Sequence, residues 1–188
     1  MRLNFYDTIK SLIPSIVVNA RGKFRMGVEQ YRNRLDNAKS YGEVWNIVRD
    51  TVEFYLGKRR GGMMLFLDDL PLQLGAYHPV GTNNIVLNRR LVEIVEASIK
   101  NKRVVNALIY NLLLHEYLHA LGILSEVKVR RLVHVVARKC FGENHVAAVI
   151  AEKTPWALLK GISLEHVNVR RRVMEIVKDF EKTDKYIV

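Results

Sequence analysis

The chain has 188 residues, enough to bury a sizeable core in one domain or in one domain with an extension. Its 30 Lys and Arg against 19 Asp and Glu give a formal net charge of +11, which favours acidic surfaces or nucleic acids as partners. The single cysteine, Cys140, excludes an internal disulfide framework and favours a reducing setting. No apolar run approaches the roughly 18 residues of a membrane-spanning helix, and the first residues lack the apolar core of a secretory signal. We therefore expect a cytoplasmic protein with no membrane span.

The first 60 residues predict a helical N-terminal extension with a basic face. Helical spacing is interrupted at Pro14 and Gly42, and Ser40 is a suitable cap for a helix with apolar residues from Val44 to Tyr55. This part holds 12 Lys and Arg against 6 Asp and Glu, which is typical of a solvated face or, in the alternative, of a nucleic-acid contact. We expect a second domain over residues 61–188, unless the two parts form one compact unit.

Three short segments after Gly61 and Gly62 predict a small three-stranded sheet. Residues 63–67 form an apolar run bounded by acidic residues and proline, residues 72–78 form a second candidate strand, and residues 84–88 follow a turn. Either of the last two segments, at residues 74–78 or 84–88, can form an exposed edge of the sheet.

Helical spacing dominates the rest of the chain. We expect helices over residues 89–99, 104–121, 126–140, 146–151 and 165–180, with a further turn that begins near Pro155 and ends at Gly161. The sequence therefore predicts a predominantly helical α+β fold, in which the sheet packs on the buried helix 104–121 and on a backing helix.

The helix at residues 104–121 contains the pattern His115-Glu116-x-x-His119 and is closed by Gly122. Residues four apart lie on the same face of a helix, so the two imidazoles can point at one metal ion. Glu116 projects beside that point, where it can take a proton from metal-bound water. The helix is apolar nearly all round and is expected to be buried, where unpartnered polar groups would each cost about 1 to 3 kcal/mol. These residues therefore predict a metal site.

The four residues His115, Glu116, His119 and Gly122 resemble the active-site helix of the zincin metallopeptidases. In layout the resemblance covers residues 63–150. It is nearer to the small archaeal zincins of the minigluzincin type and to the SprT-like group than to the metzincins, which have a third histidine at the position of Ser125. The resemblance implies a zinc-dependent hydrolase that acts on a protein or peptide substrate.

In zincins an extended segment upstream of the motif forms the edge strand along which the substrate lies, and an exposed sheet edge can pair with a peptide by strand addition. By this resemblance, His78 and Asn84 in the two candidate edge segments are expected to contact the substrate.

A catalytic zinc usually has three protein ligands and an open position for water, so a third ligand is expected after Gly122. His145 is the favoured candidate, because it stands at a helix start after a glycine loop and no local pattern explains it otherwise. The alternatives are Glu126 just past the turn, Glu143 in the loop before His145, and His134, which is expected to face solvent. A glutamate ligand would make the site gluzincin-like.

The expected reaction is hydrolysis of a peptide bond by metal-activated water, with Glu116 as the general base that then passes the proton to the leaving nitrogen. One alternative is a basic nucleic-acid-binding protein with a structural zinc, which would need a fourth ligand, and Cys140 is the only thiol. A DNA-associated, SprT-like protease would combine the two ideas. A zincin scaffold held latent by its own terminal segment is a third hypothesis.

Overall fold

The computed structural model describes residues 17–18, 24–25, 27–159 and 172–181 of the chain. The described residues form a predominantly helical α+β fold, as the sequence predicted. The helices are α2 (Val28–Asp36), α3 (Tyr41–Leu56), α4 (Arg89–Ile99), α5 (Lys102–Ala120), α6 (Glu126–Phe141) and α7 (Val146–Lys153), followed by a short 3-10 helix, η1 (Pro155–Leu159). The strands are β1 (Val17–Val18), β2 (Phe24–Arg25), β3 (Met64–Asp68), β4 (Ala76–Tyr77), β5 (Asn84–Asn88) and β6 (Glu175–Ile176). Within these residues, no helix has the length and apolar character needed to cross a membrane.

The main sheet has four strands in the order β4-β5-β3-β6, one more than the sequence predicted. Strands β3 and β5 run parallel, with Leu65 beside Ile85, whereas β4 and β6 are antiparallel to their neighbours. Strand β5 is therefore an inner strand, and the expectation that residues 84–88 form an edge is wrong. The alternative at residues 74–78 is confirmed, because β4 lies at one edge of the sheet.

The fourth strand, β6, lies where the sequence predicted a helix. Of the predicted helix at residues 165–180, the part up to residue 171 lies outside the described residues, and the rest is extended and turns. Phe66 pairs with Ile176, and the Val177 N–H donates to the Leu65 carbonyl at 2.9 Å. Pairing with β3 provides the hydrogen bonds that the backbone of residues 175–177 would otherwise form within a helix. A contact distant in sequence therefore overrides the helical spacing of the apolar residues.

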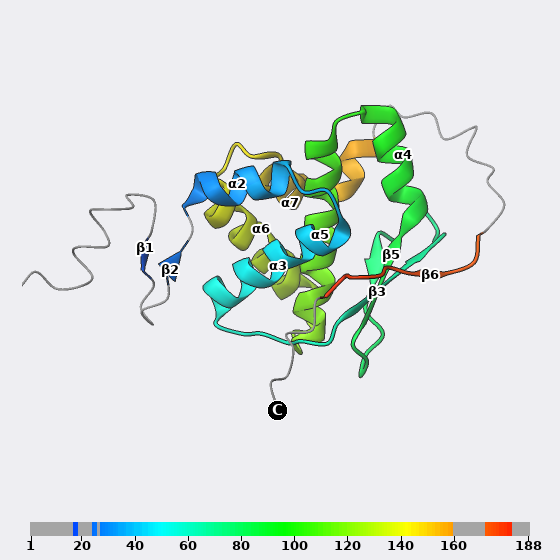
Figure 1. Ribbon diagram of the computed structural model, residues 1–188, viewed down its shortest axis with the longest axis horizontal. Coiled ribbons are helices and arrows are strands. Elements are labelled where there is room, and N and C mark those ends of the chain that lie inside the picture. Colours follow the sequence, from blue (N-terminus) through cyan, green and yellow to red (C-terminus); the bar gives the residue numbers. More distant parts are fainter. Residues whose placement is uncertain (1–16, 19–23, 26, 160–171, 182–188) are drawn as a thin grey trace, which may run out of the picture.

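Helix α5 is the centre of the fold (Figure 1). It stands between a group of helices, α2, α3, α6 and α7, and the side that carries α4 and the sheet. Aromatic side chains fix it from two directions: Tyr117 packs edge-on against Trp45 of α3, with ring centroids 4.7 Å apart, and Tyr110 packs in the same way against Phe141 of α6 at 4.9 Å. Because its neighbours surround it, α5 is buried on nearly every side, as its sequence predicted.

Helices α2 and α3 lie in the region predicted as an N-terminal extension. Helix α3 begins as expected at Ser40, whose side chain accepts a hydrogen bond from the Glu43 N–H, and it ends at Gly57 in the left-handed conformation. Buried residues of both helices, such as Leu35 and Trp45, belong to the same hydrophobic core as α5. Residues 1–16, including the predicted break at Pro14, lie outside the described residues.

Candidate metal centre

The last turns of α5 bring the two motif histidines together. The Nε2 atoms of His115 and His119 are 3.2 Å apart, as expected for residues one helical turn apart on the same face. The Nδ1 of His119 is 2.9 Å from the carbonyl oxygen of Ile123. A carbonyl oxygen only accepts, so Nδ1 carries a proton, and Nε2 is the ring nitrogen that faces His115 and Glu126. Nε2 of His119 is therefore oriented and available as a metal ligand.

A tight turn after α5 supplies a third donor. Gly122 has a φ of +88°, and the N–H of Ile123 donates to the Leu118 carbonyl at 3.1 Å, so the chain reverses within a few residues. Ser125 then caps α6, and Glu126 lies in its first turn. Because the turn is so short, the Glu126 carboxylate faces the histidine pair.

His115, His119 and Glu126 form a group that can hold a metal ion, with donor atoms that all lie within 4.8 Å of one another. One carboxylate oxygen of Glu126 lies 3.1 Å from His119 Nε2, and the other lies 3.4 Å from His115 Nε2. Burial lowers the pKa of His115, which favours the neutral imidazole that binds metals. Burial acts against ionisation of Glu126, but the two neighbouring imidazoles outweigh it and lower the pKa of this carboxyl group. His115 and Glu126 thus favour the protonation states of metal ligands.

Glu116 lies beside this group but does not belong to it. Its side chain is buried, and burial, together with the negative charge of Glu126, raises its pKa to about 7. The backbone N–H of His78, just after β4, lies near the Glu116 carboxylate and acts in the opposite direction. A carboxyl group with a pKa near neutrality is suited to exchanging protons with a bound molecule.

A cavity of about 920 Å³ opens in front of these residues. His115, Glu116, His119 and Glu126 all line it, and residues of β4 and of the segments beside it line the opposite side. Part of the remaining wall is apolar and comes from α5, α6, α7 and η1, through Leu112, Val133, Ile150 and Trp156. The cavity is thus large enough for a segment of peptide and brings it directly to the metal-binding group.

On its outer side, strand β4 presents backbone groups that pair with no other described strand. The Asn88 N–H donates to the Gly75 carbonyl at 2.9 Å, and Ala76 and Tyr77 lie opposite Leu87 and Val86 of β5. In an antiparallel pair, residues that bond the neighbouring strand alternate with residues that point away from it. The N–H and C=O of Ala76 therefore point outward, at an edge that no other described strand covers.

The structure places His145, the favoured third ligand, elsewhere, and we correct that expectation. His145 caps α7: its Nδ1 accepts a hydrogen bond from the Ala147 N–H at 3.2 Å, and its Nε2 lies 3.0 Å from Asp36 of α2. The ring is buried and stacks on Phe141. Both ring nitrogens are thus used in joining α7 to α2, at the far end of α6 from the metal-binding group.

The other two alternatives also lie apart from the histidine pair. Glu143 forms an exposed ion pair with Arg138 at the end of α6. His134 lies in the middle of α6 and is half-buried, where the sequence predicted a solvent-facing side chain. Of the four candidates, the structure brings only Glu126 to the motif.

The two predicted substrate contacts have different positions. His78 lines the cavity, and its Nδ1 is 2.8 Å from the carbonyl oxygen of Asn84, which fixes the ring. Asn84 begins β5 and is not among the residues that line the cavity. Its main-chain carbonyl orients His78, so its contribution to the site is indirect.

Arg60 belongs to the site, although the sequence indicated only a basic cluster. Its guanidinium donates to the carbonyl of Ala120 at the end of α5 and, at 2.8 Å, to the carbonyl of Thr82 in the turn before β5. Its backbone N–H donates to the Tyr117 hydroxyl within the motif at 2.8 Å. Arg60 thus ties the end of the motif helix to the loop beyond β4, by contacts that no local pattern indicates.

Comparison of the chain with protein-family models, with curated proteins and with solved structures found no significant match.

Proposed function

We propose that this protein is a zinc-dependent metallopeptidase in which Glu116 is the general base. The observation that carries the proposal is the arrangement of His115, His119 and Glu126 around one point, with Glu116 beside them and an unpaired strand edge across the cavity. Metal donors, a proton acceptor and a place for an extended backbone are the parts that metal-assisted peptide hydrolysis needs.

The donor set suits zinc. Two imidazole nitrogens and a carboxylate oxygen are common ligands of catalytic zinc, with a fourth position left for water. Ligand atoms at roughly 2.0 to 2.1 Å from a zinc ion in a tetrahedral arrangement lie about 3.3 to 3.4 Å from one another. The two Nε2 atoms are 3.2 Å apart, one oxygen of Glu126 lies 3.1 Å from His119 Nε2, and the other oxygen lies 3.4 Å from His115 Nε2. The residues therefore fit the ion without large rearrangement.

When bound, zinc would supply a Lewis acid that polarises a carbonyl oxygen and makes a water molecule more acidic. Glu116 would accept the proton from that water and donate it to the nitrogen that leaves the cleaved peptide bond. The nearby His78 N–H would stabilise the ionised carboxylate that accepts the proton. A bound metal ion would also favour the ionised form of Glu116, and hence its action as a base.

The outer side of β4 would hold the substrate in an extended conformation. The N–H and C=O of Ala76 can form two hydrogen bonds to a peptide laid against the strand, with no sequence requirement. The backbone of His78, two residues after Ala76 on the same edge, lies near Glu116, so a peptide at β4 would lie beside the proposed base.

The test combines metal analysis with cleavage of a peptide library. The purified full chain should bind about one zinc ion and cleave library peptides, and chelation should abolish cleavage. Glu116→Gln should retain zinc and lose nearly all cleavage, because the amide cannot accept the proton. Glu143→Gln, which removes a surface carboxylate paired with Arg138, is the matched control and should cleave normally. Full hydrolysis by Glu116→Gln, or no cleavage by zinc-loaded protein, would overturn the proposal.

The alternative of a structural zinc receives less support from this arrangement. Within the described residues the group offers three donor residues, and Cys140, the only thiol, is buried in the core beside Tyr110 rather than in the group. A structural zinc site is normally closed by four protein ligands.

A further inference from the structure

Asn111 is a buried polar residue at the cavity that the proposed chemistry does not use. It lies one helical turn before His115 on α5, is 3% exposed and lines the cavity. A buried amide next to a candidate catalytic centre calls for an account of all its hydrogen bonds.

The orientation of the Asn111 amide is fixed by its neighbours. Its Nδ2 donates to the carbonyl of Ala107 at 2.8 Å and to the carbonyl of Ala147 at 3.0 Å. Because a carbonyl oxygen only accepts, reversing the amide would place oxygen against oxygen at both contacts. The other end must therefore be Oδ1, an acceptor.

This Oδ1 atom is buried and has no hydrogen-bond partner among the described residues. An unpaired buried acceptor destabilises a protein by about 1 to 3 kcal/mol, so such groups are uncommon and call for an explanation. Of the four such side-chain atoms among the described residues, Asn111 Oδ1 is the one whose residue lines the cavity. Asn106, on the same helix, also donates to two carbonyls, those of Leu35 and Ala38, but it does not line the cavity.

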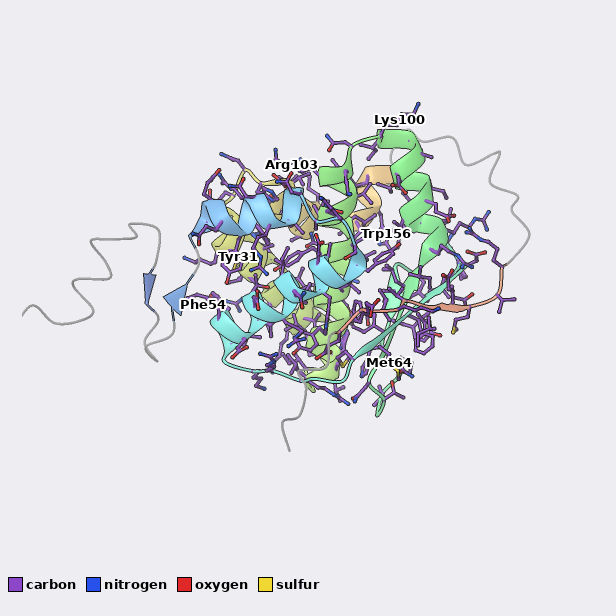
Figure 2. All side chains as sticks on the ribbon, in the orientation of Figure 1. Tyr31, Phe54, Met64, Lys100, Arg103 and Trp156 are labelled. Atoms are coloured by element: carbon purple, nitrogen blue, oxygen red, sulfur yellow. The ribbon has the colours of Figure 1, made fainter. Side chains whose placement is uncertain are left out.

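The surroundings of Asn111 in the cavity are largely apolar. Leu112, Ile150 and Trp156 line this part, and Figure 2 shows Trp156 beside α5, on the side that faces α4 and the sheet. Strand β4 approaches closely here: a Cβ added to Gly75 would lie 2.6 Å from a Leu112 methyl group and 3.5 Å from the Trp156 ring. The wall therefore favours a flat, apolar side chain with one polar group at its tip.

We propose that this part of the cavity is a specificity subsite for a substrate side chain with an aromatic body and a hydrogen-bond donor at its tip, with tyrosine as the preferred residue. The inference rests on the proposed peptidase function. The ring would pack between Leu112 and Trp156, and the hydroxyl would donate to Asn111 Oδ1. Oδ1 is buried, so the wall, in which Leu112 and Ile150 are buried and Trp156 is half-buried, must part as the ring enters.

Competing side chains fit less well. Phenylalanine would fill the same space but leave Oδ1 unpaired, so the acceptor distinguishes it from tyrosine. Lysine has donors, but between Leu112 and Trp156 its ammonium would lose hydration and meet the neutral Asn111 Oδ1 rather than a carboxylate.

The first test maps cleavage sites in a peptide library by mass spectrometry and then compares matched peptides that differ only by Tyr or Phe at the preferred position. We expect kcat/KM to be on the order of tenfold to a hundredfold higher for the Tyr peptide.

In Asn111→Leu the ratio of kcat/KM for the Tyr peptide to that for the Phe peptide should fall to about one. Asn106→Leu removes a buried amide from the same helix and should keep the wild-type ratio, which separates lost selectivity from general disturbance of α5. Cleavage with no preference for Tyr, a preference for Lys, or an unchanged ratio in Asn111→Leu would overturn the subsite and leave the peptidase proposal intact.

A second test uses the wild-type, zinc-loaded full chain and requires neither turnover nor a variant. N-acetyltyrosinamide and N-acetylphenylalaninamide are titrated into ¹⁵N-labelled protein, and the side-chain amide resonances of Asn111 and Asn106 are followed by NMR. We expect the tyrosine compound alone to shift the Asn111 amide, with Asn106 unaffected. Equal shifts by both compounds, or none, would overturn the subsite, whereas absence of cleavage alongside a tyrosine-specific shift would overturn the peptidase function alone.

Discussion

Burial of the Glu116 carboxyl group lowers the free energy of unfolding of the metal-free protein by an amount that depends on pH. Its pKa is raised from 4.5 to about 7 in the folded chain, mainly by burial. Between these values the unfolded chain releases the proton while the folded chain retains it, so the free energy of unfolding falls as pH rises from 4.5 to 7. The proposed base therefore lowers the free energy of unfolding of the metal-free protein at neutral pH.

Glu116→Gln should therefore stabilise the metal-free protein at neutral and higher pH. The amide has no charge to bury, and burial is the main cause of the raised pKa of Glu116. At pH 8 we expect a gain of up to about 3 kcal/mol over the wild type, which shrinks towards zero near pH 4.5. Urea denaturation of chelator-treated protein at several pH values measures this difference. A gain that does not change between pH 5 and pH 8 would contradict the role of ionisation.

Glu126 and His145, two of the four candidates for the third ligand, should have different effects on zinc binding and on stability when they are substituted. Glu126→Gln should weaken zinc binding at least tenfold with little effect on metal-free stability, because the carboxylate is 58% exposed and faces the histidine pair. His145→Ala should leave zinc binding unchanged but lower the free energy of unfolding by about 2 to 3 kcal/mol, since it removes the α7 cap and the contact to Asp36. Calorimetric zinc titration and urea denaturation provide the two measurements. The opposite pattern would restore His145 as the ligand.

At the scale of single residues, the sequence predicted that His115 and His119 lie together, but it favoured the wrong residue as the third metal donor. The spacing of His115 and His119 alone requires a shared helix face, and the structure has that geometry. The third donor depends on how sharply the chain turns after Gly122, which spacing does not specify. His145 was favoured because no local pattern explained it, but its explanation is non-local: Asp36, 109 positions away in sequence, accepts from its ring.

At the scale of elements, the turn between α5 and α6 determines where Glu126 lies. Gly122 adopts a φ of +88°, and a Cβ there would meet no atom within 4 Å, so only backbone strain opposes substitution. Gly122→Ala should lower the free energy of unfolding by about 1 to 2 kcal/mol and, by disturbing the turn, weaken zinc binding. Gly81→Ala is the matched control, because Gly81 has a φ of +83° and also has free space. It should show the same loss of stability with normal zinc affinity, and equal zinc affinity in both variants would contradict the role of the turn.

Elements whose pattern was long and periodic were predicted well, and those that depend on distant partners were not. The helices expected over residues 89–99 and 126–140 match α4 and α6 to within a residue. The helix expected to end at Phe180 failed because Val173, Ile176 and Val177 suit a helix by spacing alone. In the structure, Arg172 instead binds Asp69 and Glu93, which lie about 80 to 100 positions earlier in sequence.

At the scale of the whole molecule, the segment at residues 172–181 joins the sheet to the helical side of the fold. One part of it pairs with β3, and the other reaches α3, where Phe180 stacks on Trp45 with ring centroids 4.8 Å apart. Backbone carbonyls of this segment lie so close to α3 that a Cβ at Gly42 would be 2.7 Å from the carbonyl oxygen of Asp179. Trp45 also packs against Tyr117 in the motif, so this junction lies directly behind the metal-binding helix.

Glu181 is the polar centre of that junction, and its removal should destabilise the whole fold. Its carboxylate lies 3.0 Å from the guanidinium of Arg49 on α3 and accepts from the Met63 N–H at 2.9 Å, with both charged side chains about 90% buried. Glu181→Ala would leave Arg49 buried without its counter-charge, so we expect the free energy of unfolding to fall by about 3 to 5 kcal/mol. Glu53→Ala, which breaks a more exposed ion pair with Arg59, is the control and should cost less than about 1 kcal/mol. A similar decrease in the free energy of unfolding in the two variants would show that residues 172–181 contribute little to the stability of the fold. A large loss confined to Glu181→Ala would make this junction a requirement for the stability of α5.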